Sequence, residues 1–282
     1  MVIKLSQDDW LNFFSHIDTG HSLSTNSTCQ SPFHFVDRKS KTLLVTVGDS
    51  WTWGVDILEG ANDEYRVKNI YGNLISQHLC ADWLLLAQSG SGNLWLARKV
   101  QEFNRMVDFL DYERVILICT FTESGRAAHA ETEIDFVKFF KHNQPKDLLK
   151  FLDDIAMSWI LDSTIDSRIT LLIGRNFVDN WPLDTHALET PWYQLMQTNE
   201  KIHSMCHVVS PFVIDDLREL IDLAPKNTRN DILSMMSDLA NTAIERANLL
   251  QSLPHIRNYH PNADGHRLWA EYVINKLSLI SM

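Results

Sequence analysis

Short apolar runs alternate with longer amphipathic stretches between residues 41 and 175, and this order limits the folds open to the chain. The stretches between the runs indicate helices over 71–79, 94–110 and 145–161. The runs themselves are typical of buried strands and cover residues 42–47, 83–87, 114–120 and 169–173, with one more at 208–213. Strands that alternate with helices pair in parallel and are covered on both faces. The sequence therefore predicts an α/β fold, a three-layer α/β/α sandwich with a mainly parallel sheet.

Two regions depart from this alternation. Residues 1–40 hold a short amphipathic segment and then a stretch rich in Ser, Thr and Asn, which we interpret as an N-terminal extension of a main domain at 41–282. Around 176–250 the chain is longer than a plain crossover requires, and aromatic residues such as Trp181 and Trp192 occur there. We expect this insertion to cover the carboxyl edge of the sheet as a cap. A dimer surface or ordinary packing is the alternative.

Charge and composition narrow the possible partners. The net charge of -11 and the pI near 5.5 argue against a nucleic-acid-binding surface, which needs clustered Lys and Arg. No stretch has the length and apolarity of a membrane span, and the N-terminus lacks the pattern of a secretory signal. The expected location is therefore cytoplasmic, with no membrane and no nucleic acid as partner.

The four cysteines are scattered and form no Cys-x-x-Cys pair. This spacing is typical of reduced thiols, and Cys119, inside an apolar run, is expected in the core. No Gly-x-Gly-x-x-Gly or Walker sequence follows a predicted strand. The sequence thus predicts no cofactor and no metal, and it carries no feature that sets an oligomeric state.

A candidate nucleophile follows the first predicted strand. Residues 43–47 are apolar, and the next three are Gly48, Asp49 and Ser50. Ligands of open α/β sheets bind at the carboxyl ends of the strands, where a serine at the start of a helix is well placed to attack a substrate. The alternative is that Ser50 only caps the helix, because Asp and Ser are both common N-cap residues.

A candidate general base lies near the C-terminus. His260 precedes Pro261, which favours extended backbone, and a helix follows it. A loop histidine in this place can reach the carboxyl edge of the sheet, whereas His266, in the first turn of the helix, is expected to cap or pack. Ser50 and His260 together support a Ser-His centre more strongly than either residue does alone.

The order of these blocks resembles the SGNH (GDSL-type) hydrolase family. The matching features are Gly48-Asp49-Ser50 after the first strand, the glycine-containing loop 88–93 after the second, and His-Pro-x-x-x-Gly-His before the last helix. The resemblance implies a flavodoxin-like α/β/α sandwich and serine ester hydrolysis or acyl transfer without a metal. It implies that Ser50 is the nucleophile, His260 the base, and the N–H groups of Ser50 and Gly90 two donors to the oxyanion.

The third block of the family is altered. The family usually places an Asn side chain after the third strand as a further oxyanion donor, and Thr122 occupies that position here. Its hydroxyl is one candidate donor, and Asn93 or Arg126 is another. Arg126 also suits a substrate carboxylate or phosphate, with an ion pair to Glu123 or Glu131 as the alternative.

The family's acid is also missing from its usual place. The position three residues before the base is Arg257 rather than Asp. A backbone carbonyl, Asn258 or an acid from elsewhere in the chain must then orient the imidazole. This departure predicts a Ser50–His260 dyad or a displaced acid.

Trp51 and Trp53 flank Ser50 and either line a substrate slot or pack beneath the turn. Taken together, the sequence predicts a serine hydrolase that deacylates a small polar or carbohydrate-like ester. An acyltransferase on the same scaffold is one alternative, recognised by acyl transfer to an added acceptor. A non-catalytic binding protein is the other, recognised by a folded chain whose Ser50 does not react with a fluorophosphonate.

Overall fold

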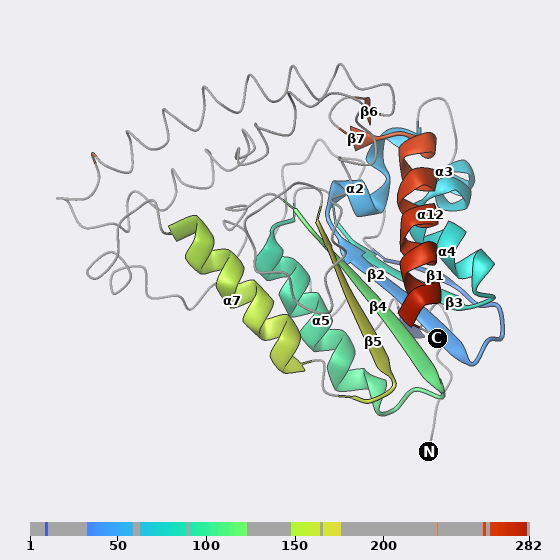
Figure 1. Ribbon diagram of the computed structural model, residues 1–282, viewed down its shortest axis with the longest axis horizontal. Helices are drawn as coiled ribbons and strands as arrows, with labels where there is room; N and C mark the ends of the chain where they lie inside the picture. The colour runs from blue at the N-terminus through green and yellow to red at the C-terminus, as the bar shows by residue number, and fades with distance from the viewer. Residues whose placement is uncertain are drawn as a thin grey trace.

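The computed structural model describes most of the predicted sheet and the helices that cover it (Figure 1). The described residues are 9–10, 33–58, 63–88, 91–122, 148–163, 166–175, 230, 256–257 and 260–280. The predicted cap at 176–250 and the predicted strand at 208–213 lie outside these ranges, except for residue 230.

Within the described residues, the central sheet has five strands in the order β1-β3-β2-β4-β5. Strand β1 pairs antiparallel with β3, and the remaining neighbours are parallel, with Val45 beside Leu84 on one side and Leu117 on the other. The predicted α/β class with a mainly parallel sheet is therefore confirmed. The strands are β1 (Phe33–Val36), β2 (Thr42–Gly48), β3 (Asp82–Ala87), β4 (Arg114–Phe121) and β5 (Ile169–Arg175).

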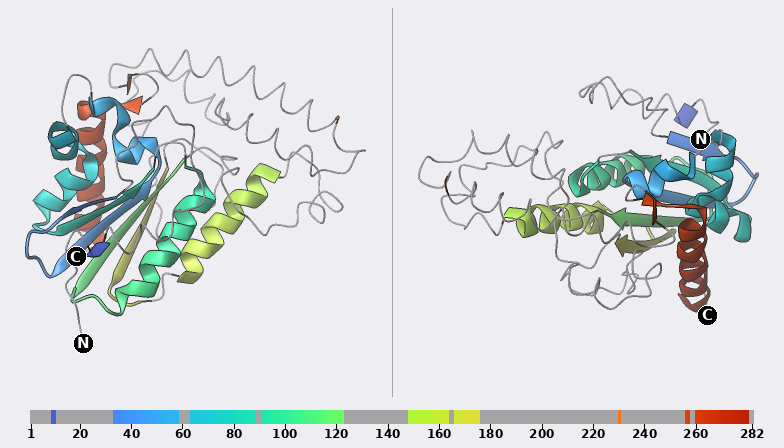
Figure 2. Two further views of the ribbon diagram at one scale, coloured as in Figure 1. Left: turned by 180° about the vertical axis from the view of Figure 1, so that it is seen from behind. Right: turned by 90° about the horizontal axis from the view of Figure 1, so that it is seen from above.

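Helices cover both faces of the sheet, as the view from above shows (Figure 2). Alternate residues of the buried strands point to opposite faces. Leu43 and Val45 face a core that includes α5 (Asn93–Val107) and α7 (Leu148–Ser163). Leu44 faces a second core with the helices on the other side of the sheet. These helices are α2 (Ser50–Trp53), α4 (Tyr71–His78) and α12 (Ala263–Ile280), near the short η1 (Val55–Leu58) and α3 (Asp63–Asn69).

Two parts of the predicted N-terminal extension are described: Trp10 packs in the core, and strand β1 belongs to the sheet. Trp10 is 1% exposed and lies against Phe35 and Phe103, with ring centroids 6.0 and 6.3 Å apart. Strand β1 also falls within residues 1–40, and it is the edge strand beside β3. The domain boundary at residue 40 stays a prediction.

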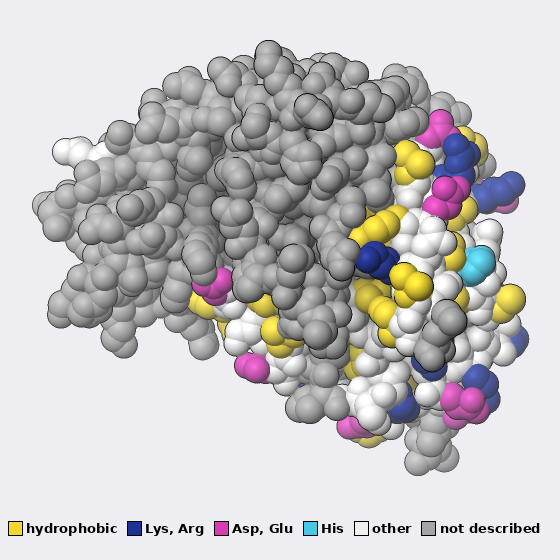
Figure 3. All heavy atoms as spheres, in the orientation of Figure 1, with side chains coloured by type: hydrophobic (Ala, Val, Ile, Leu, Met, Phe, Trp, Pro, Cys, Tyr) yellow, Lys and Arg dark blue, Asp and Glu magenta, His cyan; other side chains and the backbone are white. Residues whose placement is uncertain are grey.

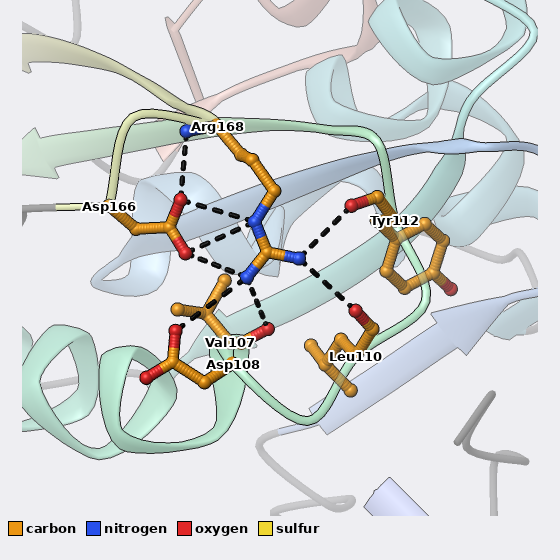
Figure 4. Close-up of polar contacts among 6 residues, drawn as sticks. All are labelled: Val107, Asp108, Leu110, Tyr112, Asp166 and Arg168. Carbon is orange, nitrogen blue, oxygen red and sulfur yellow. Dashed lines mark hydrogen bonds and ion pairs between the residues drawn. The ribbon is translucent and has the colours of Figure 1, made fainter. Parts of the chain in front are cut away.

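Helix α5 ends at Val107, earlier than the predicted 110, because the chain turns there. The amides of Phe109 and Leu110 bond to carbonyls three residues back, at Met106 and Val107. Arg168, just before β5, binds this end of the helix (Figure 4). Its guanidinium donates to the carbonyl of Val107 at 2.9 Å and to those of Leu110 and Tyr112 at 3.2 Å.

Asp166 pairs with the same guanidinium at 2.7 Å. The hydrogen bonds from Arg168 hold the pKa of Asp166 below its usual value. A cation at a helix C-terminus also interacts favourably with the helix dipole. This cluster joins α5 to the amino end of β5, at the edge of the sheet opposite the carboxyl ends.

On the face shown in Figure 3, Lys and Arg side chains of the described residues alternate with Asp and Glu and with apolar groups. None of the described helices combines the length and the apolarity that crossing a bilayer requires. Cys119 is fully buried, as predicted, and burial raises the pKa of its thiol.

Candidate active site

The carboxyl end of β2 leads directly into the one-turn helix α2. Asp49 is the N-cap: its carboxylate accepts a hydrogen bond from the amide of Trp51 at 3.0 Å. Gly48 is required because the helix lies so close that a Cβ there would be 1.9 Å from the Thr52 hydroxyl oxygen. Ser50 is the first helical residue, so Asp49 rather than Ser50 caps α2.

Ser50 and His260 are in contact although 210 residues separate them. The Nε2 atom of His260 lies 3.0 Å from the Oγ atom of Ser50. Ser50 is 2% exposed and His260 is half-buried. This distance is within the range in which a base accepts the proton of a nucleophile.

A short hairpin and a helix cap place His260. It lies in β7 (His260–Pro261), which pairs with β6 (Ile256–Arg257), and Arg257 is its register partner. Asn262 follows and accepts hydrogen bonds from the amides of Asp264 and Gly265 at 3.1 Å, which fixes the start of α12. Strand β7 packs against α2, η1 and α12, so His260 is held between the nucleophile helix and the last helix.

Thr122 and Asn93 lie together at the same edge of the sheet. The side-chain oxygen of Asn93 accepts from the amide of Thr122 at 3.0 Å, and its Nδ2 donates to the Thr122 carbonyl at 3.4 Å. Both residues are buried. Asn93, at the start of α5, therefore fixes the backbone of Thr122 immediately after β4.

The loop after β3 folds against the carbonyl of Gly48. This carbonyl accepts from the amide of Gln88 at 3.2 Å and from the hydroxyl of Ser91 at 3.4 Å. The two residues flank Gly90, which lies outside the described residues. These two hydrogen bonds hold the described ends of the loop on Gly48, which precedes Ser50 by two residues in the sequence.

Trp51 and Trp53 are both buried, at 4% and 9% exposure, in the core on the α12 side of the sheet. The guanidinium carbon of Arg66 lies 3.7 Å from the centre of a Trp53 ring, and Arg66 also donates to the Trp53 carbonyl at 2.7 Å. Arg66 is itself paired with Asp63 at 2.7 Å. These contacts fit packing beneath the turn, and a role in substrate binding stays a prediction.

The buried Tyr71 and His266 connect several elements near Ser50, and no pattern in the sequence predicts their pairing. The amide of Tyr71 donates to Nδ1 of His266 at 3.3 Å, and the two rings stack with centroids 6.0 Å apart. Burial, with the charge of Arg66 as a smaller cause, lowers the pKa of His266 to about 3. His266 is therefore neutral, and it both packs on Tyr71 and accepts the first amide of α4, whereas the sequence predicted that it caps or packs.

Several predicted site residues fall outside the described part of the chain. Arg126 and Asn258 are among them, and for Arg257 only the backbone is described. Their predicted roles stay predictions. Among the described residues, no group of three or more His, Cys, Asp or Glu side chains gathers as metal ligands would.

Sequence comparison finds no family model and no curated protein that matches the chain. Solved structures do match it, at low similarity. A member of the lipolytic protein G-D-S-L family from Veillonella parvula is 11% identical, covering 83% of this chain and 97% of that one, with a TM-score of 0.36. A carbohydrate acetylesterase family member from Sinorhizobium meliloti is 12% identical, with coverages of 84% and 98% and a TM-score of 0.37.

A family two carbohydrate esterase from Clostridium thermocellum, solved in complex with cellohexaose, is 11% identical. The match covers 84% of this chain and 63% of that one, with a TM-score of 0.37. The candidate site is defined by the contacts within this chain.

Proposed function

We propose that the protein is a serine hydrolase that cleaves an ester through Ser50 and His260. The observation that carries the proposal is the 3.0 Å contact between Ser50 Oγ and His260 Nε2 at the carboxyl edge of the sheet. Fixed hairpin and helix-cap contacts hold the two residues on different elements. A hydroxyl paired with an imidazole in this way is typical of nucleophilic catalysis.

In the proposed reaction, Nε2 of neutral His260 accepts the proton of Ser50 Oγ as Oγ bonds to the acyl carbon. The tetrahedral intermediate then collapses, the bond to the leaving alkoxide breaks, and His260 gives its proton to that oxygen. Water then gives a proton to the same imidazole and bonds to the acyl carbon of the acyl-serine. The bond from that carbon to Oγ breaks, the acid leaves, and His260 returns the proton to Oγ. The proposed centre is a Ser50–His260 dyad whose imidazole is oriented by a backbone carbonyl or Asn258, or a triad with a displaced acid in that role.

The developing oxyanion needs donors near Ser50. The N–H of Ser50 is proposed as one donor, because Ser50 is the first residue of α2 and the first amides of a helix have no partner inside it. Gly90 is proposed as the second, supported by the anchoring of Gln88 and Ser91 on Gly48. The Thr122 hydroxyl is the proposed third donor. Asn93 then acts by holding Thr122, since both ends of its amide contact the Thr122 backbone.

The proposed substrate class is a small polar or carbohydrate-like ester. Trp51 and Trp53 are proposed to line the substrate site, and Arg126 to bind a charged group. A panel that compares acetylated sugars with simple aryl acetates tests the class. An added alcohol acceptor in the same assay separates hydrolysis from acyl transfer, because only transfer yields the new ester.

The test of the proposal is steady-state hydrolysis of p-nitrophenyl acetate by paired variants. Ser50→Ala and His260→Ala should each lower kcat by about a thousandfold or more, because each removes a group that forms or breaks a bond. The matched controls are Ser158→Ala on α7 and His78→Ala on α4, since both side chains are exposed and distant in sequence from the centre. Full activity in His260→Ala would contradict the dyad.

A further inference from the structure

Tyr71 is fully buried, and its contacts are with elements that form or adjoin the candidate active site. It is the first residue of α4, where the helix leaves its first amides without partners inside the helix. The N-cap, Ile70, makes no side-chain hydrogen bond to this end of the helix. The amide of Tyr71 is instead bound by a side chain of another helix, His266 in α12.

The hydroxyl of Tyr71 lies between the strand and the helix that form the nucleophile side of the site. It is 3.1 Å from the hydroxyl oxygen of Thr120, in β4, and 3.5 Å from that of Thr52, in α2. Thr52 lies two residues after Ser50, and its side chain packs directly on Gly48. A shift of Thr52 would therefore be passed to the turn that carries Ser50.

The other contacts of Tyr71 are with α12, the helix that follows His260 in the sequence. Its amide donates to Nδ1 of His266 at 3.3 Å, and its ring stacks on the imidazole at an interplanar angle of 13°. His266 lies in the first turns of α12, whose start is fixed by Asn262 next to β7. Through this helix, Tyr71 is connected to the strand that carries His260.

We infer that Tyr71 is a positioning residue that holds Ser50 and His260 at their 3.0 Å separation. Its hydroxyl fixes α2 relative to β4, while its amide and ring fix α12. Because these backbone and side-chain contacts belong to one buried residue, the two halves of the site move together. The inference rests on the proposed Ser50–His260 chemistry, and it adds a residue that touches neither the nucleophile nor the base in the described contacts.

A second buried tyrosine provides a matched control. Tyr112 is 3% exposed, and its hydroxyl donates to Asp82 at 2.9 Å. Asp82 begins β3 and Tyr112 lies just before β4, so this hydrogen bond is at the amino ends of the strands, opposite the site. Tyr71→Phe and Tyr112→Phe each remove one buried hydroxyl and keep the ring.

The first test compares kcat, KM and the rate of fluorophosphonate labelling in the two variants, at a temperature where both are fully folded. Tyr71→Phe should lower kcat and the labelling rate about tenfold with KM nearly unchanged, because a displacement of a fraction of an ångström misaligns the reacting atoms. Tyr112→Phe should retain wild-type kcat even if its Tm falls. Equal rates in the two variants, whether both normal or both reduced, would overturn the inference.

Crystal structures of the same variants test the inference without requiring catalytic activity. The inference predicts a longer Oγ–Nε2 distance in Tyr71→Phe and an unchanged one in Tyr112→Phe. If wild-type Ser50 never reacts, the proposed function fails, and this distance alone then decides whether Tyr71 positions the pair. An unchanged distance in Tyr71→Phe would refute the positioning role.

Discussion

Asp49 and Ser50 are adjacent, and both residue types favour the N-cap position of a helix. Here one residue caps the helix and the other contacts His260. The sequence predicts that a cap lies here but leaves open which residue provides it. The structure gives the cap to Asp49, whose carboxylate takes the Trp51 amide, and leaves the Ser50 hydroxyl in contact with His260. The pairing of Tyr71 with His266 has no sequence signal, since their contact depends on how α4 and α12 pack.

His266 carries a pH-dependent contribution to stability. Its folded-state pKa of about 3 lies below the ordinary value of 6.5, so between these values the unfolded chain binds a proton that the folded chain does not. Stability from this residue is therefore complete above pH 6.5 and is lost as the pH falls, by roughly 1.4 kcal/mol for each pH unit.

Urea unfolding at pH 7.5 and pH 5.0 measures this effect. His266→Asn removes the titrating group, so the variant should lose about 2 kcal/mol less than the wild type between the two pH values. Only the difference between the losses is compared, because the substitution also changes packing at both pH values. His78→Asn, at an exposed position of α4, is the control and should behave as wild type. Equal losses in His266→Asn and the wild type would contradict the assignment.

At the scale of elements, the length of a strand or helix decides whether the sequence predicts it. The described strands β2–β5 and the helices α4, α5 and α7 are long enough to show their periodicity, and their predicted ranges agree within a few residues. The four-residue α2 and the two-residue β6 and β7 are too short for any period, although they carry Ser50 and His260. Strand β1 escaped prediction because it is also short and follows a polar stretch.

Arg168 should stabilise the junction of α5 and β5 without affecting chemistry. Arg168→Met removes the donors to Val107, Leu110, Tyr112 and Asp166, and we expect the free energy of unfolding to fall by about 2 kcal/mol. Because the cluster lies at the amino ends of the strands, kcat for ester hydrolysis should not change.

Lys41 gives the matched control for this prediction. Its ion pair with Asp111, at 3.1 Å, is exposed on both sides, so Lys41→Met should cost less than about 0.5 kcal/mol. Urea unfolding of both variants makes the comparison. Similar losses in the two would show that the partly buried carbonyl contacts of Arg168 contribute little.

At the scale of the whole molecule, the parallel sheet explains how distant residues meet. The carboxyl ends of β2, β3 and β4 lie at one edge, which brings residues 48–50, 88, 91–93 and 122 together. Helix α12 packs on α4 and contacts β7, the strand just before it, which carries His260 to the same place. The order of the motifs predicted that these segments share one edge of the sheet, and the chemical roles assigned to their residues stay predictions. The role of Asn93 in holding Thr122, and the Tyr71 contacts, depend on side-chain geometry that motif order does not contain.

The most direct measurement is the intact mass of the chain after treatment with a fluorophosphonate, for the wild type, Ser50→Ala and His260→Ala. An activated serine predicts one adduct on the wild type, none on Ser50→Ala, and labelling slowed by several orders of magnitude in His260→Ala. Ser158→Ala, which removes an exposed hydroxyl, should label like the wild type. An unlabelled but folded wild type, or an adduct that persists in Ser50→Ala, would contradict the Ser50–His260 centre.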